Sequence, residues 1–362
     1  MLLSNNKIFT ALLLTAALAG ISARAQQAPA PATVVAPKPS AAVPVPATAV
    51  EPQASPAKPA QRPGTGVERA DQGAVFRTDT RLVVLPVTVV DKSGHLITNL
   101  PRTAFQVFEN GVQQEIKIFK REDVPVSMGL IVDNSGSMRD KREKVKDASL
   151  ALVKDSNPSD EVFVVNFNDD AYLDTKDFTS DVKEMEEALS KIDSRGGTAM
   201  RDAIRMSIDH MKEKAHKDKR VLVVVTDGND NASMISLENL VKAAQQSEVL
   251  IYTIGLLSEE EHREAKRAER ALKALAQATG GEAYFPKEVG DVDRIAHQVA
   301  RDIRNQYTIA YSPSIQALDG SFRQIKVVAN APNRPTVRTR SGYYATAESA
   351  LNVSKNGGGP SK

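Results

Sequence analysis

The hydrophobic positions of this chain follow two periods, one typical of buried strands and one typical of amphipathic helices. Continuous apolar runs bounded by turn formers predict buried strands at 127–132, 161–167, 220–226, 249–255 and 282–285. Between these strands, apolar residues recur at helical spacing on three faces. The faces are formed by Val182, Met185, Leu189 and Ile192; by Met200, Ala203, Ile204, Ser207, Ile208 and Met211; and by Val292, Ile295, Ala296, Val299 and Ile303. This alternation predicts an α/β fold with a doubly wound, mostly parallel, Rossmann-like sheet covered on both faces.

Strand patterns without intervening helices flank the α/β region on both sides. The expected strands before it are 81–90, 105–108 and 114–119, and those after it are 307–311, 322–328 and 336–340. Asn110-Gly111 is a typical tight-turn dipeptide and predicts a hairpin between 105–108 and 114–119. We expect the two flanking segments to form one small antiparallel β-sandwich, with the α/β domain inserted between them. Two separate β additions, or extra edge strands on the main sheet, are the alternatives.

The beginning of the chain has the pattern of a secretory signal. Lys7 precedes an apolar stretch at 8–20 that is short for a membrane span, and Ala23-Arg24-Ala25 matches the small-x-small cleavage pattern. We expect a signal peptide at 1–25, export of the protein, and no transmembrane span in the mature chain. An uncleaved anchor or a buried core helix is the alternative.

The remaining boundaries follow from composition. Proline, alanine and valine dominate after residue 25, which favours an extended, semi-stiff linker over a packed core. The end of the chain loses periodicity and is glycine-rich, so we expect it to be disordered. The expected parts are a signal peptide at 1–25, a disordered linker at 26–75, the first part of the sandwich at 76–122, the α/β domain at 123–306, the second part of the sandwich at 307–345, and a tail at 346–362.

Composition excludes several classes of function. Apolar residues make up 41% of the chain, enough for a sizeable core, and the formal net charge of +2 argues against general affinity for nucleic acid or acidic membranes. The absence of cysteine excludes disulfides, thiolate zinc sites and cysteine nucleophiles, and also a lipid anchor at the predicted cleavage site.

A run of oxygen-bearing side chains follows the first predicted strand of the α/β region. In Asp133-Asn134-Ser135-Gly136-Ser137, positions 133, 135 and 137 project to the same side if the backbone stays extended. One carboxylate and two hydroxyls are hard ligands that suit Mg²⁺, Mn²⁺ or Ca²⁺ and suit Zn²⁺ poorly. Taken alone, the run also fits a turn whose Asp or Ser caps the next helix.

Two later stretches favour the metal site. Gly196-Gly197-Thr198 offers another hydroxyl before a helix, and the strand at 220–226 leads directly into Asp227-Gly228. Asp133 and Asp227 thus follow the carboxyl ends of predicted strands, where open α/β sheets bind their ligands. The candidate metal residues are Asp133, Ser135, Ser137, Thr198 and Asp227.

The order D-x-S-x-S, G-T and T-D-G, with helices between, resembles the von Willebrand factor A (VWA) domain and its metal-ion-dependent adhesion site (MIDAS). Together with Asp91-x-x-Gly94, 105–111 and 340–344, these motifs resemble the exported bacterial "VWFA-related domain" proteins over roughly residues 75 to 345. The resemblance implies that Ser135, Ser137 and Thr198 bind the metal directly, and that Asp133 and Asp227 lie close, often acting through water. It also implies a periplasmic or secreted bacterial protein.

The function implied by this resemblance is adhesion or another protein–protein interaction. The metal, most readily Mg²⁺, keeps much of its charge among hydroxyls and attracts an Asp or Glu of a protein partner. A metal-assisted hydrolase and a structural envelope component are the alternatives. We expect no enzyme, because the motifs contain no obvious general base and the chain has no G-x-S-x-G nucleophile elbow.

Overall fold

The computed structural model describes residues 81–346, except 192–193, 229 and 258–261. The predicted signal peptide at 1–25 and linker at 26–75 lie outside these residues, as does the expected tail from residue 347 onward. Within the described part, every helix is too short or too polar to cross a membrane.

A six-stranded sheet forms the centre of the α/β part, in the order β10-β9-β8-β5-β6-β7. Its strands are β5 (Val126–Asp133), β6 (Glu161–Phe167), β7 (Ala171–Leu173), β8 (Lys219–Thr226), β9 (Leu250–Gly255) and β10 (Ala283–Tyr284). All neighbours pair in parallel except β7, which pairs antiparallel with β6. The predicted mostly parallel sheet is therefore confirmed. The edge strand β7 was not predicted, because its apolar run of three residues is too short to indicate a strand.

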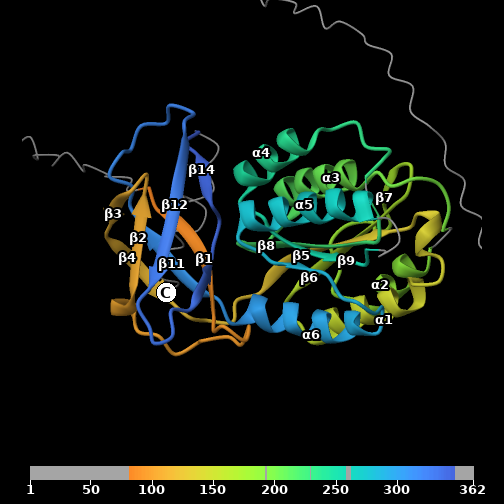
Figure 1. Cartoon of the computed structure of the whole chain (residues 1–362), viewed down its shortest axis with the longest axis horizontal. Coiled ribbons are helices and arrows are strands. Elements are labelled where there is room, and N and C mark those ends of the chain that lie inside the picture. Colours follow the sequence, from red (N-terminus) through yellow and green to blue (C-terminus); the bar gives the residue numbers. More distant parts are fainter. Residues whose placement is uncertain (1–80, 192–193, 229, 258–261, 347–362) are drawn as a thin grey trace, which may run out of the picture. The chain divides into compact units, whose positions relative to one another are not determined.

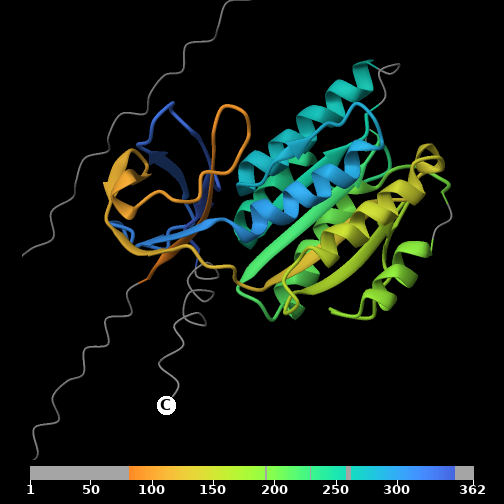
Figure 2. The same cartoon turned by 90° about the horizontal axis from the view of Figure 1, so that it is seen from below.

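Helices cover both faces of this sheet (Figures 1 and 2). One face carries α1 (Arg142–Lys154), α2 (Val182–Ser190) and α6 (Asp291–Arg304), and the other carries α3 (Met200–Lys214), α4 (Leu237–Ser247) and α5 (His262–Thr279). Successive residues of β5 alternate between the two cores, with Leu130 in the first and Ile131 in the second. Burial on both faces explains why these strands are continuous apolar runs. The predicted faces of α3 and α6 are buried, as are Met185 and Leu189 of α2, whereas Val182 is half-buried and Ile192 lies outside the described residues. Ala188, Ala300 and Asp302 are buried as well and were not predicted.

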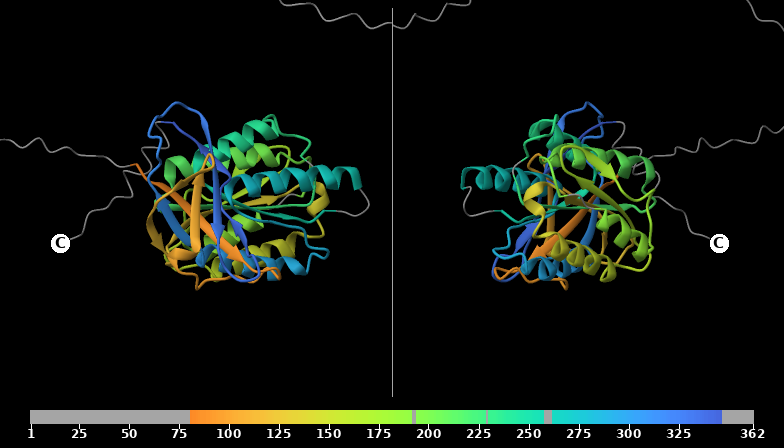
Figure 3. Two further views of the ribbon diagram at one scale, coloured as in Figure 1. Left: turned by 60° about the vertical axis from the view of Figure 1, so that its left-hand side comes forward. Right: turned by 90° about the vertical axis from the view of Figure 1, so that its right-hand side faces the viewer.

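The flanking segments form two four-stranded antiparallel sheets, β13-β1-β11-β4 and β14-β12-β2-β3. The strands before the α/β part are β1 (Val83–Val90), β2 (Phe105–Glu109), β3 (Val112–Gln114) and β4 (Ile116–Lys120), with the short 3-10 helix η1 (Arg102–Ala104) ahead of β2. The strands after it are β11 (Tyr307–Tyr311), β12 (Phe322–Ala329), β13 (Thr336–Arg338) and β14 (Gly342–Tyr344). Both sheets combine the two groups, since β1 pairs with β11 and β2 with β12. Figure 3 shows the orange strands of the first group among the blue strands of the second.

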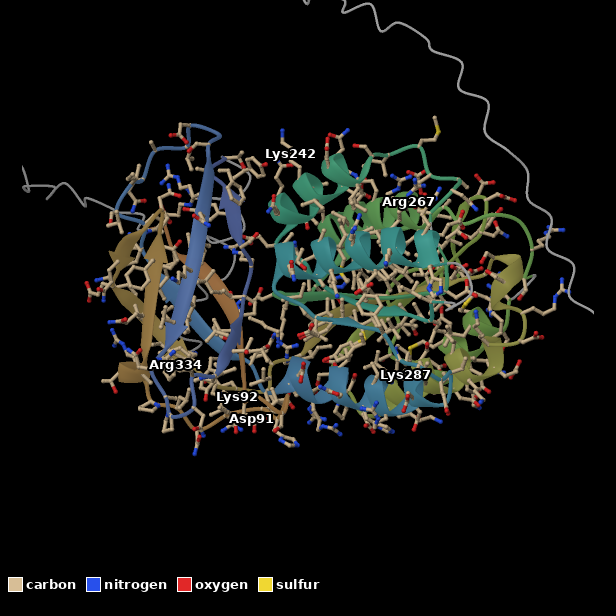
Figure 4. The ribbon with its side chains drawn as sticks, in the orientation of Figure 1. Asp91, Lys92, Lys242, Arg267, Lys287 and Arg334 are labelled. Atoms are coloured by element: carbon tan, nitrogen blue, oxygen red, sulfur yellow. The ribbon has the colours of Figure 1, made fainter. Side chains whose placement is uncertain are left out.

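Two turns in the sandwich follow the sequence closely. Asn110 and Gly111 both have positive φ, 48° and 81°, and join β2 to β3 as predicted for this dipeptide. After β1, the Gly94 amide donates to the Asp91 carbonyl at 3.1 Å, and Asp91 and Lys92 lie at the periphery (Figure 4).

The expected strand at 114–119 is in part wrong. Residues 112–114 pair with β2, whereas 116–120 form β4 beside β11 in the other sheet. Gln114 and Ile116 are both buried and Glu115 between them is exposed. That alternation looks the same whether the chain stays in one sheet or changes sheet at Glu115, so the pattern could not show the change.

Candidate metal centre

The predicted site residues meet where the strand order of the central sheet reverses. From β5 the chain first adds β6 on one side and later adds β8 on the other. Asp133 is the last residue of β5, and Asp227 directly follows β8. In an open α/β sheet, this point beyond the carboxyl ends of the strands is where ligands bind.

Asp133 is completely buried and both of its carboxylate oxygens are occupied. Oδ1 accepts a hydrogen bond from the Ser135 amide at 2.8 Å, and Oδ2 accepts one from Thr226 Oγ1 at 2.5 Å. Burial raises the pKa of Asp133 to about 6, against the lowering effect of these hydrogen bonds, and nearby Asp227 raises it further. These bonds make Asp133 a support that orients the Ser135 loop.

A row of hydrogen-bonded oxygens extends from Ser135 to Asp227. Ser135 Oγ lies 3.2 Å from Ser137 Oγ, which in turn donates to Asp227 Oδ1 at 2.8 Å. The short 3-10 helix η2 (Gly136–Met138) begins directly after Ser135 and places Ser137 in this row, with Met138 buried beneath. Four of the five predicted residues are thus joined by direct hydrogen bonds, with Asp133 joined through the Ser135 amide.

The loop that carries Thr198 is bound to both of the other loops. The Gly136 amide donates to the Gly196 carbonyl at 3.5 Å, and the Thr198 amide donates to Asn231 Oδ1 at 2.8 Å. Thr198 Oγ1 lies 3.7 Å from the position that a Cβ atom on Gly228 would take. Thr198 therefore lies beside the Asp227 loop, although within the described part of the chain no hydrogen bond joins its hydroxyl to Ser135, Ser137 or Asp227.

Two cations at the start of α1 complete the site, and sequence reasoning missed both. Lys141 Nζ donates to Asp227 Oδ2, and Arg142 Nη1 donates to Asn134 Oδ1. Burial lowers the pKa of Arg142 to about 10, against the raising effect of Asp133. Their position at the start of a helix could have indicated them. The helix macrodipole disfavours cations at an N-terminus, so two adjacent cations there suggest that an anionic group lies nearby.

The oxygen spacings fit a small hard cation. Six oxygens arranged octahedrally at about 2.1 Å from Mg²⁺ have neighbouring oxygens about 3 Å apart. The spacings of 3.2 Å from Ser135 to Ser137 and 2.8 Å from Ser137 to Asp227 bracket that value. Among the described residues, no three or more His, Cys, Asp or Glu form a cluster suited to a metal. A metal ion at this site would therefore be held by hydroxyl groups together with one carboxylate.

Comparison with known proteins gives a family match over the α/β part. Residues 128–299, which include all five predicted site residues, match the family model described as the von Willebrand factor type A domain. The chain is 29% identical over 163 residues to mouse calcium-activated chloride channel regulator 1, covering 42% of this chain and 16% of that protein. It is 24% identical over 136 residues to bovine inter-alpha-trypsin inhibitor heavy chain H4, covering 34% and 15%. The chain thus spans about a sixth of the length of these two relatives.

Solved structures resemble this chain at low sequence identity. A von Willebrand factor type A protein from Catenulispora acidiphila matches with a TM-score of 0.44 at 12% identity, over 74% of this chain and 75% of that one. The vWF domain of the type V pili tip protein Mfa5 from Porphyromonas gingivalis matches with a TM-score of 0.41 at 14% identity, over 50% and 97%.

Proposed function

Because residues 128–299 form a von Willebrand factor type A domain, we propose that this chain binds a divalent metal ion and uses it to hold a protein partner. The proposed metal residues are Asp133, Ser135, Ser137, Thr198 and Asp227, and the preferred ion is Mg²⁺. Domains of this family often mediate protein–protein interaction or adhesion. The observation that carries the proposal is that Ser135, Ser137 and Asp227, from two separate loops, bring their side-chain oxygens together beyond the carboxyl ends of β5 and β8.

The residues of the site divide their roles by charge. Ser135, Ser137 and Thr198 offer uncharged hydroxyls, Asp227 offers one carboxylate, and Asp133 orients the Ser135 loop. When bound, the ion supplies a positive charge to which a carboxylate of a partner can bind.

The surrounding charges support an acidic partner. Asp133 and Asp227 carry two negative charges when ionised, and Lys141 and Arg142 carry two positive charges. These four side chains are therefore neutral together. When a divalent ion binds and Lys141 leaves Asp227, the ion, Arg142 and the two carboxylates still carry an excess of about one positive charge. Such an excess favours an Asp or Glu side chain of the partner over a neutral one.

The proposed place of action is the periplasm or the outside of a bacterial cell, on the strength of the predicted signal peptide at 1–25. We propose a binding role, because four histidines that could act as general bases do not pair with the site residues. His95, His210, His216 and His297 pair instead with Asp91, Asp177, Glu161 and Asp155.

Thermal unfolding in EDTA and in Mg²⁺ tests metal binding. With free Mg²⁺ at 100 times Kd, the unmodified protein is expected to gain about 2.7 kcal/mol of unfolding free energy. Ser137→Ala and Thr198→Ala remove one oxygen ligand each and are expected to gain much less. Ser190→Ala, which removes an exposed hydroxyl at the end of α2, is the matched control and should respond like the unmodified protein. An equal response from all four proteins would reject the site.

A displayed library of acidic peptides, screened in Mg²⁺ and again in EDTA, tests the partner chemistry. Bound peptides are expected to lose binding when EDTA is added, and also when one Asp or Glu is replaced by Asn or Gln. Peptides that bind equally well in EDTA, or after every acidic residue is replaced, would contradict metal-dependent recognition of a carboxylate.

A further inference from the structure

We propose that Lys141 is a tethered cation that pairs with Asp227 in the metal-free protein and so sets the Mg²⁺ concentration at which the site fills. The inference rests on the proposed metal function and adds a residue to it. Lys141 lies outside the predicted metal residues and provides no oxygen ligand. Its proposed role is to compete with the metal for one carboxylate.

The contacts of Asp227 place the ammonium group inside the site. One carboxylate oxygen, Oδ1, accepts the hydrogen bond from Ser137 Oγ at 2.8 Å, and the other, Oδ2, accepts one from Lys141 Nζ. The Asp227 side chain is only 1% exposed. A carboxylate so removed from water requires a cation or several hydrogen-bond donors, and Lys141 supplies the cation when no metal is bound.

Lys141 can leave this pair without any change in the backbone. Its amide donates to the Met138 carbonyl at 2.9 Å and its carbonyl accepts from the Val145 amide at 3.1 Å, so the main chain is fixed at the start of α1. Its side chain is 25% exposed and has a flexible four-carbon stem, so Nζ can rotate into water. Asp227 has no comparable freedom, which makes Lys141 the part that moves.

Arg142 differs from its neighbour in this respect. It is only 5% exposed, and its guanidinium donates to Asn134 Oδ1 beneath the site. The two adjacent cations therefore include one fixed charge and one displaceable charge. A divalent ion bound to Asp227 repels an ammonium on the same carboxylate, so filling the site requires Lys141 to leave Asp227.

Isothermal calorimetry with Mg²⁺ measures the effect of this competition on Kd. Lys141→Met removes the charge, Lys141→Gln removes the charge but keeps a hydrogen-bond donor, and Lys141→Arg keeps the charge. The first two variants are expected to lower Kd by at least about tenfold, equivalent to about 1.4 kcal/mol. Lys141→Arg is expected to bind Mg²⁺ like the unmodified protein.

Lys144→Met is the matched control, because Lys144 is an exposed lysine one turn further along α1. It removes the same charge from the same helix without touching the pair that Lys141 forms with Asp227, and its Kd should stay within about twofold of the unmodified value because exposed charges are screened. Thermal unfolding in EDTA adds a readout without metal. There, Lys141→Met should be less stable than Lys144→Met, because Asp227 has lost its cation.

The outcomes separate this inference from the proposed function. A lower Kd for Lys141→Met and Lys141→Gln, or Mg²⁺ binding that appears only in these variants, supports the tethered cation. Equal Kd values for all variants, or weaker binding after the charge is removed, would overturn the role of Lys141 and leave the metal site standing. No Mg²⁺ binding by any variant would overturn the metal site itself.

Discussion

Asp133 and Asp227 show how the immediate surroundings give two carboxylates at one site different roles. The oxygens of Asp133 are both taken by donors from its own loop and from Thr226, in a fully buried position. Asp227 instead binds a side-chain hydroxyl on one oxygen and a displaceable ammonium on the other. Asp133 therefore orients the loop, and Asp227 is the carboxylate that a metal can reach.

The raised pKa of Asp133 predicts how stability depends on pH without metal. Burial raises its pKa from an ordinary value of 3.8 to about 6, so between these values the folded protein binds more protons than the unfolded chain. In EDTA, the unfolding free energy contributed by this group should fall as pH rises from about 4 to 6, by up to about 3 kcal/mol. Asp133→Asn removes the titration and should flatten the curve in this range. Chemical denaturation at several pH values measures it, and identical slopes for the two proteins would contradict the assignment.

Strands β2 and β12 of the sandwich are joined by charged side chains as well as by backbone hydrogen bonds. Glu109 at the end of β2 lies 3.3 Å from Arg323 of β12 and accepts hydrogen bonds from Tyr311 at 2.6 Å and Tyr343 at 3.0 Å. Glu109 and Arg323 are both buried, and burial raises the pKa of Tyr343 to about 12, a shift that Glu109 increases. This network links strands that precede and follow the α/β part.

Replacing one member of the buried Glu109–Arg323 pair should destabilise the folded protein. Arg323→Met leaves Glu109 buried without its cation and should lower the unfolding free energy by about 3–5 kcal/mol. Glu109→Gln should cost less, because Arg323 still lies 3.7 Å from Asp319 and donates to the Ala317 carbonyl. The double variant should lose less than the sum of the two, because no unpaired charge remains. Lys326→Met changes an exposed lysine on the same strand and should stay within about 0.5 kcal/mol of the unmodified protein. Urea denaturation measures the four variants and the unmodified protein, and additive losses would contradict the coupling.

At the scale of the whole chain, the α/β part contains every element that the proposed site requires. The five site residues lie on or beside β5, β8 and the start of α3, and both helical layers come from residues 142–304. The sandwich, in contrast, needs strands from both flanking segments. We therefore propose that the α/β part is an inserted domain that folds and binds metal by itself.

A fragment spanning residues 123–306 tests this arrangement. It should unfold cooperatively and gain as much unfolding free energy from Mg²⁺ as the full chain, within about 0.5 kcal/mol. A fragment spanning 81–306 lacks β11 to β14, so β1 loses both of its partners and β2 keeps only β3, and the fragment should aggregate more readily. Circular dichroism melts with and without Mg²⁺ measure the first expectation and light scattering the second. A 123–306 fragment that is unfolded would show that the α/β part depends on the sandwich.

The sequence by itself determined the features that depend on residues close together along the chain. The apolar runs and helical faces predicted the mostly parallel sheet and three of its six covering helices in the described part, α2, α3 and α6, and Asn110-Gly111 predicted the hairpin after β2. These predictions succeed because burial and turn conformation leave a periodic or local pattern in the chain. The order of the motifs likewise indicated the loops in which Asp133, Thr198 and Asp227 lie.

Only the tertiary structure decided which of these groups touch. Lys141 and Asp227 are 86 positions apart, and their pairing follows from the adjacency of β5 and β8, which no local pattern encodes. The crossing of the chain from one sheet to the other at Glu115 also depends on strands that are distant in the sequence, and so does the hydrogen bond from Thr226 to Asp133. Each depends on what a neighbouring strand or loop presents at that point, and this is defined only when the sheets are assembled.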